Sequence, residues 1–329
     1  MSETRWLVVK GKGGLGNRLL SLLTAMVYAQ LSGRRLVVDW RDPVYSDDGS
    51  DAFQRLFDCE TAASPDALPA TDSVTPDVWR GRLDDSIAVL QRAIGLTGKE
   101  LRLRSSIDVT RIDYGEEVAV MWAMSSKIDL MRRRFRGPFR ELRPLSTKAI
   151  LQRLLREELR LNARIGERVG RFRQDDVAGE TVGVHARYGD RRVRLGAIVD
   201  HVDTLVARQP GLRIFLATDN IAVKEHFERR YAATVTTPHW YPRPGDSAHQ
   251  NRDCPDRAEN AVEALVDLYL LASCEWLVVD TTSSFSRIAE ALSQAAAARI
   301  FDVRRLPRMR EHVLQRLARP DLLRRLAPG

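Results

Sequence analysis

Three side chains able to do chemistry follow one buried strand in the middle of the chain: His185, Arg187 and Asp190. Alternation along that strand places His185 and Arg187 on the same side as the chain leaves the sheet. A guanidinium there can bind a pyrophosphate through two parallel hydrogen bonds and stabilise the charge of a departing nucleoside diphosphate. A structural ion pair between Arg187 and Asp190 explains the motif equally well.

Two acidic residues lie near strand ends or in an apolar helix of the same half. Asp219 belongs to the run Ala217–Asn220, which ends a strand. Its short polar side chains could bond a ribose or a base, although capping of the following helix is the better interpretation of that run alone. Asp267 lies inside an apolar helix, where it is either a ligand contact or a buried capping partner.

A third polar run, Asp280–Arg287, joins a strand to a helix. Backbone N–H groups at the start of a helix and the helix dipole favour a bound phosphate, and hydroxyl side chains add donors. A simple N-cap is the alternative. The hydroxyl residues proposed to bind substrate here are Thr282, Ser283 and Ser284.

A glycine-rich run near the N-terminus allows close approach of the backbone to a ligand. It matches neither the G-x-G-x-x-G spacing nor the G-x-x-x-x-G-K-[ST] pattern, so tight packing of a strand on a helix is a sufficient explanation of it alone. Its candidate substrate-binding residues are Gly14, Gly16, Asn17 and Arg18.

These motifs sit in an alternating pattern of apolar strands and amphipathic helices, which predicts an α/β fold with parallel sheets. Strands are expected at 6–9, 36–40, 118–122, 182–187, 212–217, 234–236, 276–280 and 299–303. Helices are expected at 19–31, 146–169, 197–208, 222–231, 258–272 and 285–298. In parallel sheets ligands bind beyond the carboxyl ends of the strands, and this groups the polar motifs into one site.

The polar connection 171–180 marks the predicted domain boundary. We expect an N-terminal Rossmann-like domain at 1–172 and a C-terminal Rossmann-like domain at 173–305. The basic segment 306–329 is predicted to form a helix that packs back on the first domain.

Composition limits the class of protein. Among 329 residues, 52 are Lys or Arg and 44 are Asp or Glu, a net charge of +8 that favours an anionic partner. The basic residues are scattered without an aromatic-interleaved motif, so nucleic acid is not the expected partner. No H-E-x-x-H motif, strand-end D-x-D or C-x-x-C pair predicts a metal site.

No apolar run is long enough to span a membrane, and the N-terminal apolar run is too short for a signal peptide. These features predict a cytoplasmic protein.

Four motifs in order resemble a known family. They are Gly-Gly-Leu-Gly-Asn-Arg at 13–18, His-Ala-Arg-Tyr-Gly-Asp at 185–190, Ala-Thr-Asp-Asn at 217–220 and Thr-Ser-Ser-Phe-Ser-Arg at 282–287. Together they are similar to the fucosyltransferase superfamily, and the run from Tyr28 to Arg41 resembles its rhizobial nodulation branch most.

The resemblance implies a GT-B fold, in which two Rossmann-like parallel-sheet domains face a central cleft. It implies that the domain at 1–172 lies on the acceptor side and that the domain at 173–305 binds the nucleotide sugar. It also implies an inverting glycosyltransferase that moves fucose from GDP-fucose to a hydroxyl of a glycan or glycosylated metabolite, with no metal or other cofactor. The alternatives are a transferase for another nucleotide-activated sugar and a non-catalytic nucleotide-binding protein.

The resemblance further implies a role for each motif residue. Arg187 would hold the β-phosphate and stabilise the leaving GDP, Ser283 and Ser284 would contact phosphate, and His185 would line the same pocket. Three carboxylates would organise the nucleotide and the arginine: Asp190, Asp219 and Asp267. The candidates of the glycine-rich run would border the site from the first domain.

One departure from the family concerns the general base. In the core alpha-1,6 enzymes a Glu follows the H-x-R motif, whereas residues 191–196 here are Arg-Arg-Val-Arg-Leu-Gly, with no carboxylate before Asp200. The base is therefore not assigned by the resemblance. Asp190 is a candidate, although pairing with Arg187 could occupy it.

Overall fold

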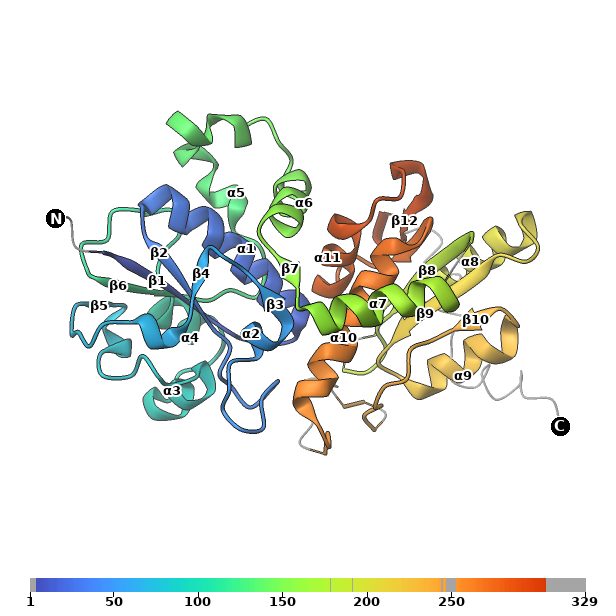
Figure 1. The fold of residues 1–329 in the computed structure, drawn as a ribbon, viewed down its shortest axis with the longest axis horizontal. Helices are drawn as coiled ribbons and strands as arrows, with labels where there is room; N and C mark the ends of the chain where they lie inside the picture. The colour runs from blue at the N-terminus through green and yellow to red at the C-terminus, as the bar shows by residue number, and fades with distance from the viewer. Residues whose placement is uncertain (1–3, 178, 191, 244, 247–252, 306–329) are drawn as a thin grey trace. The chain divides into compact units, whose positions relative to one another are not determined.

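The structure is a computed structural model that describes residues 4–305 except 178, 191, 244 and 247–252. It divides into two compact units (Figure 1). Unit 1 comprises Met1–Arg168 and Arg252–Val266, and unit 2 comprises Val169–Asn251 and Asp267–Gly329, in each case within the described residues. The predicted boundary between residues 172 and 173 stays a prediction, and the predicted helix at 306–329 lies outside the described residues.

Unit 1 is built on a parallel sheet with the strand order β4-β2-β1-β6-β5. Its strands are β1 (Trp6–Lys10), β2 (Arg35–Asp39), β4 (Ala62–Ala63), β5 (Val74–Thr75) and β6 (Val118–Met121). In the centre, Val8 of β1 pairs with Val37 of β2 and Val120 of β6, and all three side chains are fully buried. Such a run of buried β-branched residues is typical of a parallel sheet covered on both faces.

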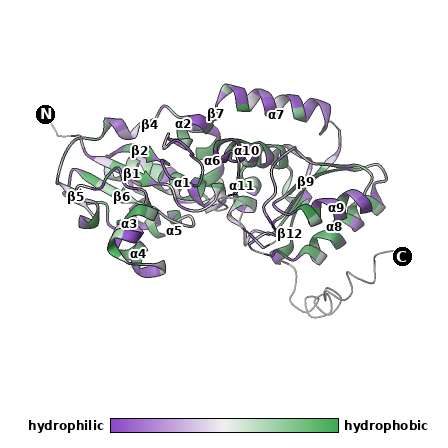
Figure 2. Ribbon diagram, turned by 90° about the horizontal axis from the view of Figure 1, so that it is seen from below, coloured by the Kyte–Doolittle hydropathy of each residue, from purple (hydrophilic) through white to green (hydrophobic). Residues whose placement is uncertain are grey.

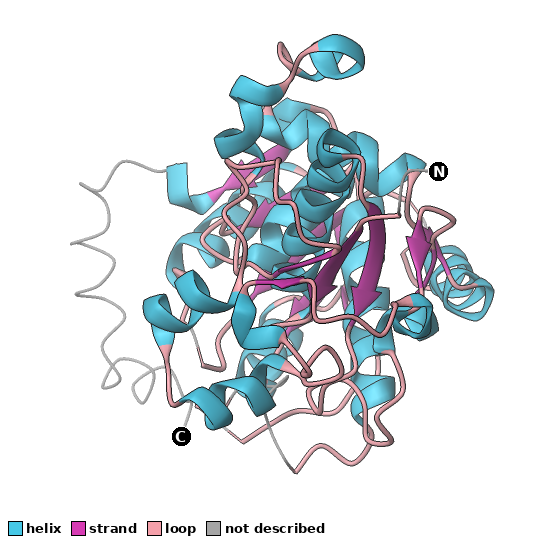
Figure 3. Cartoon of the chain, turned by 90° about the vertical axis from the view of Figure 1, so that its left-hand side faces the viewer, coloured by secondary structure: helices cyan, strands magenta, loops and turns pink. Residues whose placement is uncertain are grey.

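Helices surround this sheet (Figure 3). The glycine-rich run leads from β1 into α1 (Leu15–Ser32), which ends at Gly33 in the left-handed conformation, with φ +64°. Glycine adopts that conformation without steric cost, and Gly33 caps the C-terminus of α1. The other α-helices in the described part of unit 1 before residue 160 are α2 (Ala52–Leu56), α3 (Ile87–Ile94), α4 (Gly98–Ser105), α5 (Ile128–Met131) and α6 (Thr147–Glu157).

The single helix predicted at 146–169 is wrong. The structure has α6, then the short strand β7 (Arg160–Leu161), then α7 (Ala163–Asp175), which Figure 2 shows as mostly hydrophilic. β7 pairs antiparallel with β3 (Phe57–Asp58), and Leu159 is buried. The amphipathic period continues through the break, so pattern alone could not reveal a strand pairing with a distant segment. The predicted connection at 171–180 is partly helical, because residues 171–175 belong to α7.

Asp51 in unit 1 gives a testable pH dependence. Its Oδ1 atom caps α2 by accepting from the backbone N–H of Phe53 at 2.9 Å, while its buried Oδ2 atom has no partner in the described residues. Burial raises the pKa of this carboxyl to about 6 from 3.8. The folded state therefore keeps a proton that the unfolded state has lost, and the contribution of Asp51 to stability falls as pH rises from 3.8 to about 6.

We expect Asp51→Asn, which caps equally well without ionising, to gain stability over the wild type across that pH range. A shift of this size corresponds to at most about 3 kcal/mol. Urea unfolding followed by tryptophan fluorescence, repeated at several pH values, measures the difference. If the two proteins keep a constant difference at all pH values, Asp51 does not titrate as described.

Unit 2 is a second parallel sheet, with the order β10-β9-β8-β11-β12. The strands are β8 (Thr181–Ala186), β9 (Arg213–Thr218), β10 (Thr234–Val235), β11 (Trp276–Val279) and β12 (Ile300–Asp302). They alternate along the chain with α8 (Leu195–Arg208), α9 (Ile221–Arg230), α10 (Arg257–Ser273) and α11 (Ser284–Leu292), and the part of α10 up to Val266 is counted in unit 1. The chain proceeds outward from β8 through β9 to β10 and then crosses to β11 on the other side, so the strand order reverses beside β8.

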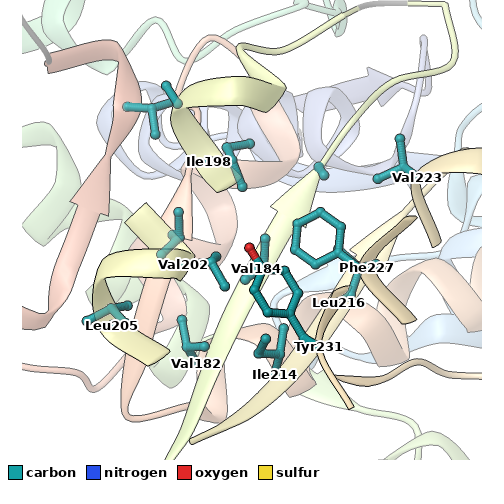
Figure 4. Packing of buried hydrophobic residues seen from close by; sticks show 14 of the residues in the cluster. Val182, Val184, Ile198, Val202, Leu205, Ile214, Leu216, Val223, Phe227 and Tyr231 are labelled. Atoms are coloured by element: carbon teal, nitrogen blue, oxygen red, sulfur yellow. The ribbon is translucent and has the colours of Figure 1, made fainter. Parts of the chain in front are cut away.

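The core of unit 2 lies between this sheet and two of its helices (Figure 4). Val184 of β8 and Leu216 of β9 are fully buried against Ile198 of α8 and Phe227 of α9. Each such side chain contributes about 1.5–3 kcal/mol when it leaves water. This packing fixes β8 and β9, whose carboxyl ends carry the polar motifs.

One helix prediction in unit 2 needs correction. The helix predicted at 285–298 ends at Leu292, because Ser293 turns the chain by accepting from the N–H of Ala295 at 3.1 Å.

Within the described residues, no helix is long and apolar enough to cross a membrane.

Candidate functional site

The polar motifs of unit 2 gather at the carboxyl edge of its sheet. His185 is in β8, with Arg187 just beyond it, Asp219 directly follows β9, and Ser283 follows β11. The strand order reverses between β8 and β11, and in open α/β sheets this is where ligands bind.

Arg187 is held by two carboxylates. Its Nε and Nη2 atoms donate to Oδ1 of Asp190 at 3.1 and 2.7 Å, and Nε lies 3.8 Å from Oδ2 of Asp219. The Arg187 side chain is 17% exposed, so the guanidinium is oriented but still accessible. The ion pair that the sequence left open is therefore present.

Asp219 shapes the loop that carries this ion pair. Its Oδ1 atom accepts from the backbone N–H groups of Tyr188 and Gly189 at 2.7 and 2.9 Å. Burial raises the pKa of Asp219, against the lowering effect of those N–H donors and of Arg187. Asn220, one residue on, caps α9 by accepting from the N–H of Val223 at 3.2 Å, as the capping interpretation predicts.

Residue 189 must be glycine because other atoms pack closely against its backbone. The sequence analysis did not identify Gly189 as a functional residue. A Cβ atom at Gly189 would lie 2.8 Å from the carbonyl oxygen of Asp246 and 2.9 Å from Oδ2 of Asp219. The only available signal was the glycine between Tyr188 and Asp190, and the sequence does not reveal which distant atoms approach it.

His185 is buried and neutral. Its Nδ1 atom is 2.7 Å from Oγ of Ser286, and its ring stacks on Phe285 at 4.8 Å between centroids. Burial, with a smaller effect of the Arg187 charge, lowers the pKa of His185 to about 3. At neutral pH the imidazole is thus a weak base, and its contact with Ser286 positions the start of α11 against β8.

The N-terminus of α11 has a buried donor without a partner. Ser283 is the N-cap residue and is 3% exposed, yet its Oγ atom makes no hydrogen bond within the described residues. The neighbouring hydroxyls are engaged: Thr281 donates to Asp302 and Thr282 donates to Asp280. A buried hydroxyl without a partner costs free energy, and a ligand oxygen at the helix start would remove that cost. Ser284 is the first residue of this helix.

Asp267 lies at the other side of β9 and is 7% exposed. It accepts from the hydroxyl of Thr237 at 2.5 Å. His239 is half-buried, and its Nε2 atom is 3.1 Å from the carbonyl oxygen of Thr218. These contacts link Asp267 to the end of β9, one residue before Asp219.

The glycine-rich run of unit 1 is shaped by Arg18, which is fully buried. Its Nε atom donates to the carbonyl oxygen of Gly13 at 2.9 Å, and Nη2 donates to Oδ1 of Asp42 at 2.8 Å. A Cβ atom at Gly13 would come within 2.8 Å of Nδ2 of Asn17. Tyr45 accepts from the N–H of Leu15 at 2.9 Å, at the start of α1, where Gly14 is the cap and Gly16 the second residue.

Arg18 therefore holds the backbone of the run, with a partner, Asp42, that sequence reasoning did not single out. That the run borders the substrate site stays a prediction.

The sequence of this chain is similar to known proteins over most of its length. Residues 3–314 match the family model of nodulation protein Z, NodZ. The chain belongs to the nodulation protein Z family. The nodulation protein Z of Azorhizobium caulinodans is 28% identical over 335 residues, covering 91% of this chain and 92% of that protein.

Solved structures of NodZ share the fold. The structure of NodZ alpha-1,6-fucosyltransferase co-crystallized with GDP has a TM-score of 0.62 at 24% identity, covering 89% of this chain and 93% of that one. The structure soaked with GDP-fucose has a TM-score of 0.61 at 21% identity, with coverage of 88% and 93%. These structures confirm the predicted GT-B fold. The match to the nodulation protein Z family confirms the predicted nodulation branch and the assignment as a fucosyltransferase.

Residues 4–305, apart from the stretches left undescribed, contain no group of three or more His, Cys, Asp or Glu side chains placed to hold a metal ion.

Proposed function

We propose that this NodZ-family chain catalyses an inverting, metal-independent transfer of fucose from GDP-fucose to a hydroxyl of a glycan or glycosylated metabolite. The observation that carries the proposal is the buried, unpartnered hydroxyl of Ser283 at the N-terminus of α11, beside the strand that presents Arg187. Hydrogen-bond donors and positive charge at one sheet edge suit a pyrophosphate. The relatives solved with GDP and GDP-fucose support the choice of nucleotide.

In this mechanism the bond between the anomeric carbon of fucose and the β-phosphate oxygen breaks while an acceptor hydroxyl attacks the opposite face. The electron pair of the broken bond stays with GDP, where Arg187 and the α11 N-terminus stabilise it. Asp190 orients Arg187 through the two hydrogen bonds described above. Asp190 is also the candidate acceptor of the hydroxyl proton, because its side chain is 33% exposed.

We also propose which residues and which unit bind each substrate, and where the protein acts. Unit 2 binds the nucleotide sugar through His185, Asp219, Asp267, Thr282, Ser283 and Ser284, while unit 1 holds the acceptor and contributes the glycine-rich run. The protein acts in the cytoplasm.

A transfer assay tests the activity. The chain is incubated with radiolabelled GDP-fucose and a library of neutral and charged oligosaccharides, with and without EDTA, and products are separated by mass. We expect product heavier by one deoxyhexose, formed equally with EDTA, and an inverted anomeric configuration by NMR. Product only from another sugar nucleotide would replace fucose as the donor sugar. Tight GDP binding without any product would favour the non-catalytic alternative.

A change at Ser283 tests the phosphate assignment. We expect Ser283→Ala to weaken GDP binding by about 10- to 100-fold, because a hydrogen bond to a charged group contributes about 1.5–3 kcal/mol. Guanosine binding should be unchanged. The matched control is Ser293→Ala, a buried serine at the opposite end of the same helix. Equal GDP affinity of wild type and Ser283→Ala by calorimetry would remove this hydroxyl from the phosphate site.

A further inference from the structure

Unit 1 has a cavity that the proposed mechanism does not use. Its volume is about 860 Å³, within the range of small-molecule sites. The lining residues are Thr110, Ile112, Asp129, Leu130, Arg133, Arg134 and Arg136. They come from the loop after α4 and from α5 and the turn that follows it, drawn in green in Figure 1.

The cavity carries uncompensated positive charge. Its one carboxylate, Asp129, forms an ion pair at 2.7 Å with Arg132, which is not a lining residue, and also accepts from the hydroxyl of Thr147. Within the described part of the chain, the side chains of Arg133 and Arg136 make no ion pair or hydrogen bond. Exposed arginines that repel one another without acidic partners lower stability slightly, so their clustering around one cavity needs another explanation.

The arginines are presented by a fixed segment. Met131 and Phe135 are at most 1% exposed and anchor it in the core of unit 1. Arg132 donates to the carbonyl oxygen of Leu145 at 2.8 Å, and Gly137 turns the chain with φ +56°. Arg134 donates through Nε and Nη2 to the carbonyl oxygen of Thr110 at 3.3 and 3.1 Å, which closes the segment onto the opposite wall.

That opposite wall is fixed as well. Asp108 accepts from the N–H and the hydroxyl of Thr110, both at 2.9 Å, and Tyr28 of α1 donates to the carbonyl oxygen of Arg111 at 2.8 Å. A site with both walls held by such contacts loses little conformational entropy when a ligand binds.

We propose that this arginine pocket, defined by its seven lining residues, binds an oligosaccharide that carries an oxyanion group, carboxylate or phosphate. Guanidinium groups recognise both oxyanions with paired hydrogen bonds. The apolar walls, Ile112 and the 55% exposed Leu130, offer surface to the C–H faces of sugar rings. A free phosphate ion would fill only a small part of about 860 Å³. The choice of a saccharide follows from the proposed function, whereas the anionic character follows from the pocket alone.

The test is calorimetric binding of three probes of similar size: a neutral chitin oligosaccharide, a galacturonic acid oligosaccharide and a phosphorylated mannose oligosaccharide. We expect wild type to bind at least one charged probe, and the two charged probes show whether carboxylate or phosphate is the recognised group. Arg133→Ala/Arg136→Ala should weaken that binding at least tenfold. The matched control, Arg140→Ala/Arg143→Ala, removes two exposed arginines of the same region that do not line the pocket, and should keep wild-type affinity.

Several results would overturn the proposal. Equal losses in both double variants would mean unspecific charge attraction, and binding of the neutral probe as tightly as the charged ones would remove the anionic requirement. Binding of anionic phospholipid vesicles, lost in the pocket variant while no saccharide binds, would assign the pocket to a membrane surface. GDP binding is measured in every variant: loss of saccharide binding with GDP binding intact concerns the pocket alone, whereas a wild type that binds no GDP contradicts the proposed function alone.

Discussion

Replacing Arg187 by alanine is expected to lower fucose transfer by about 100- to 1,000-fold while leaving the fold intact. The guanidinium is the positive charge that Asp190 and Asp219 orient at the carboxyl end of β8. Removing one preorganised donor to a developing anion costs about 2.7–4 kcal/mol of transition-state stabilisation. Initial rates with GDP-fucose and a responsive acceptor measure the loss, and circular dichroism checks the fold.

The control for Arg187→Ala is Arg192→Ala. Arg192 is an exposed arginine of the same loop, with its guanidinium carbon 5.4 Å from the centre of the Tyr188 ring. We expect this variant to retain transfer within a few-fold of wild type. Near-normal turnover of Arg187→Ala, or equal losses in the two variants, would mean that Arg187 does not stabilise the leaving group.

The second large effect is expected from Gly189→Ala. The added methyl group would sit 2.8 Å from a backbone oxygen of residue 246 and 2.9 Å from the Asp219 carboxylate, closer than Cβ contacts occur. Relief requires the loop to move off Asp219, which breaks its two backbone hydrogen bonds and displaces Arg187. We expect a loss of about 100-fold in kcat/KM, equivalent to about 2.7 kcal/mol.

Gly196→Ala is the matched control for this substitution. Gly196 lies in α8, seven residues further along the chain, and a Cβ atom there would meet no atom within 4 Å. A helical glycine replaced by alanine should be neutral or slightly stabilising. If Gly189→Ala transfers fucose as fast as Gly196→Ala, the close packing against Asp219 is not needed for activity.

Much of the fold was predictable because it depends on local pattern. The alternation of short β-branched runs with amphipathic helices predicted the three central strands of the first sheet, β2, β1 and β6, and all five strands of the second. The short strands β4 and β5 were not predicted. The break between α6 and α7 was also not predicted, because it depends on β7 pairing with β3, about a hundred residues earlier. No local window contains that information.

The candidate site likewise has some features that the sequence could predict and others that depend on tertiary packing. Residue types at strand ends were sufficient to group His185, Arg187 and Asp219, because the carboxyl ends of parallel strands meet at one edge. The sequence could not show that Ser283 has no partner while Thr282 does, since this depends on the direction of each hydroxyl. The buried pairing of Arg18 with Asp42 and the arginine pocket also depend on tertiary packing.

The central claim is that unit 2 binds GDP-fucose without a metal ion. Calorimetric titration of the chain with GDP, GDP-fucose, GDP-mannose, UDP and UDP-glucose, each with and without EDTA, tests it most directly. The account predicts binding of the guanine nucleotides, tighter for GDP-fucose than for GDP-mannose, with affinities unchanged by EDTA. Preference for the uridine nucleotides, or no binding of any nucleotide, would contradict it.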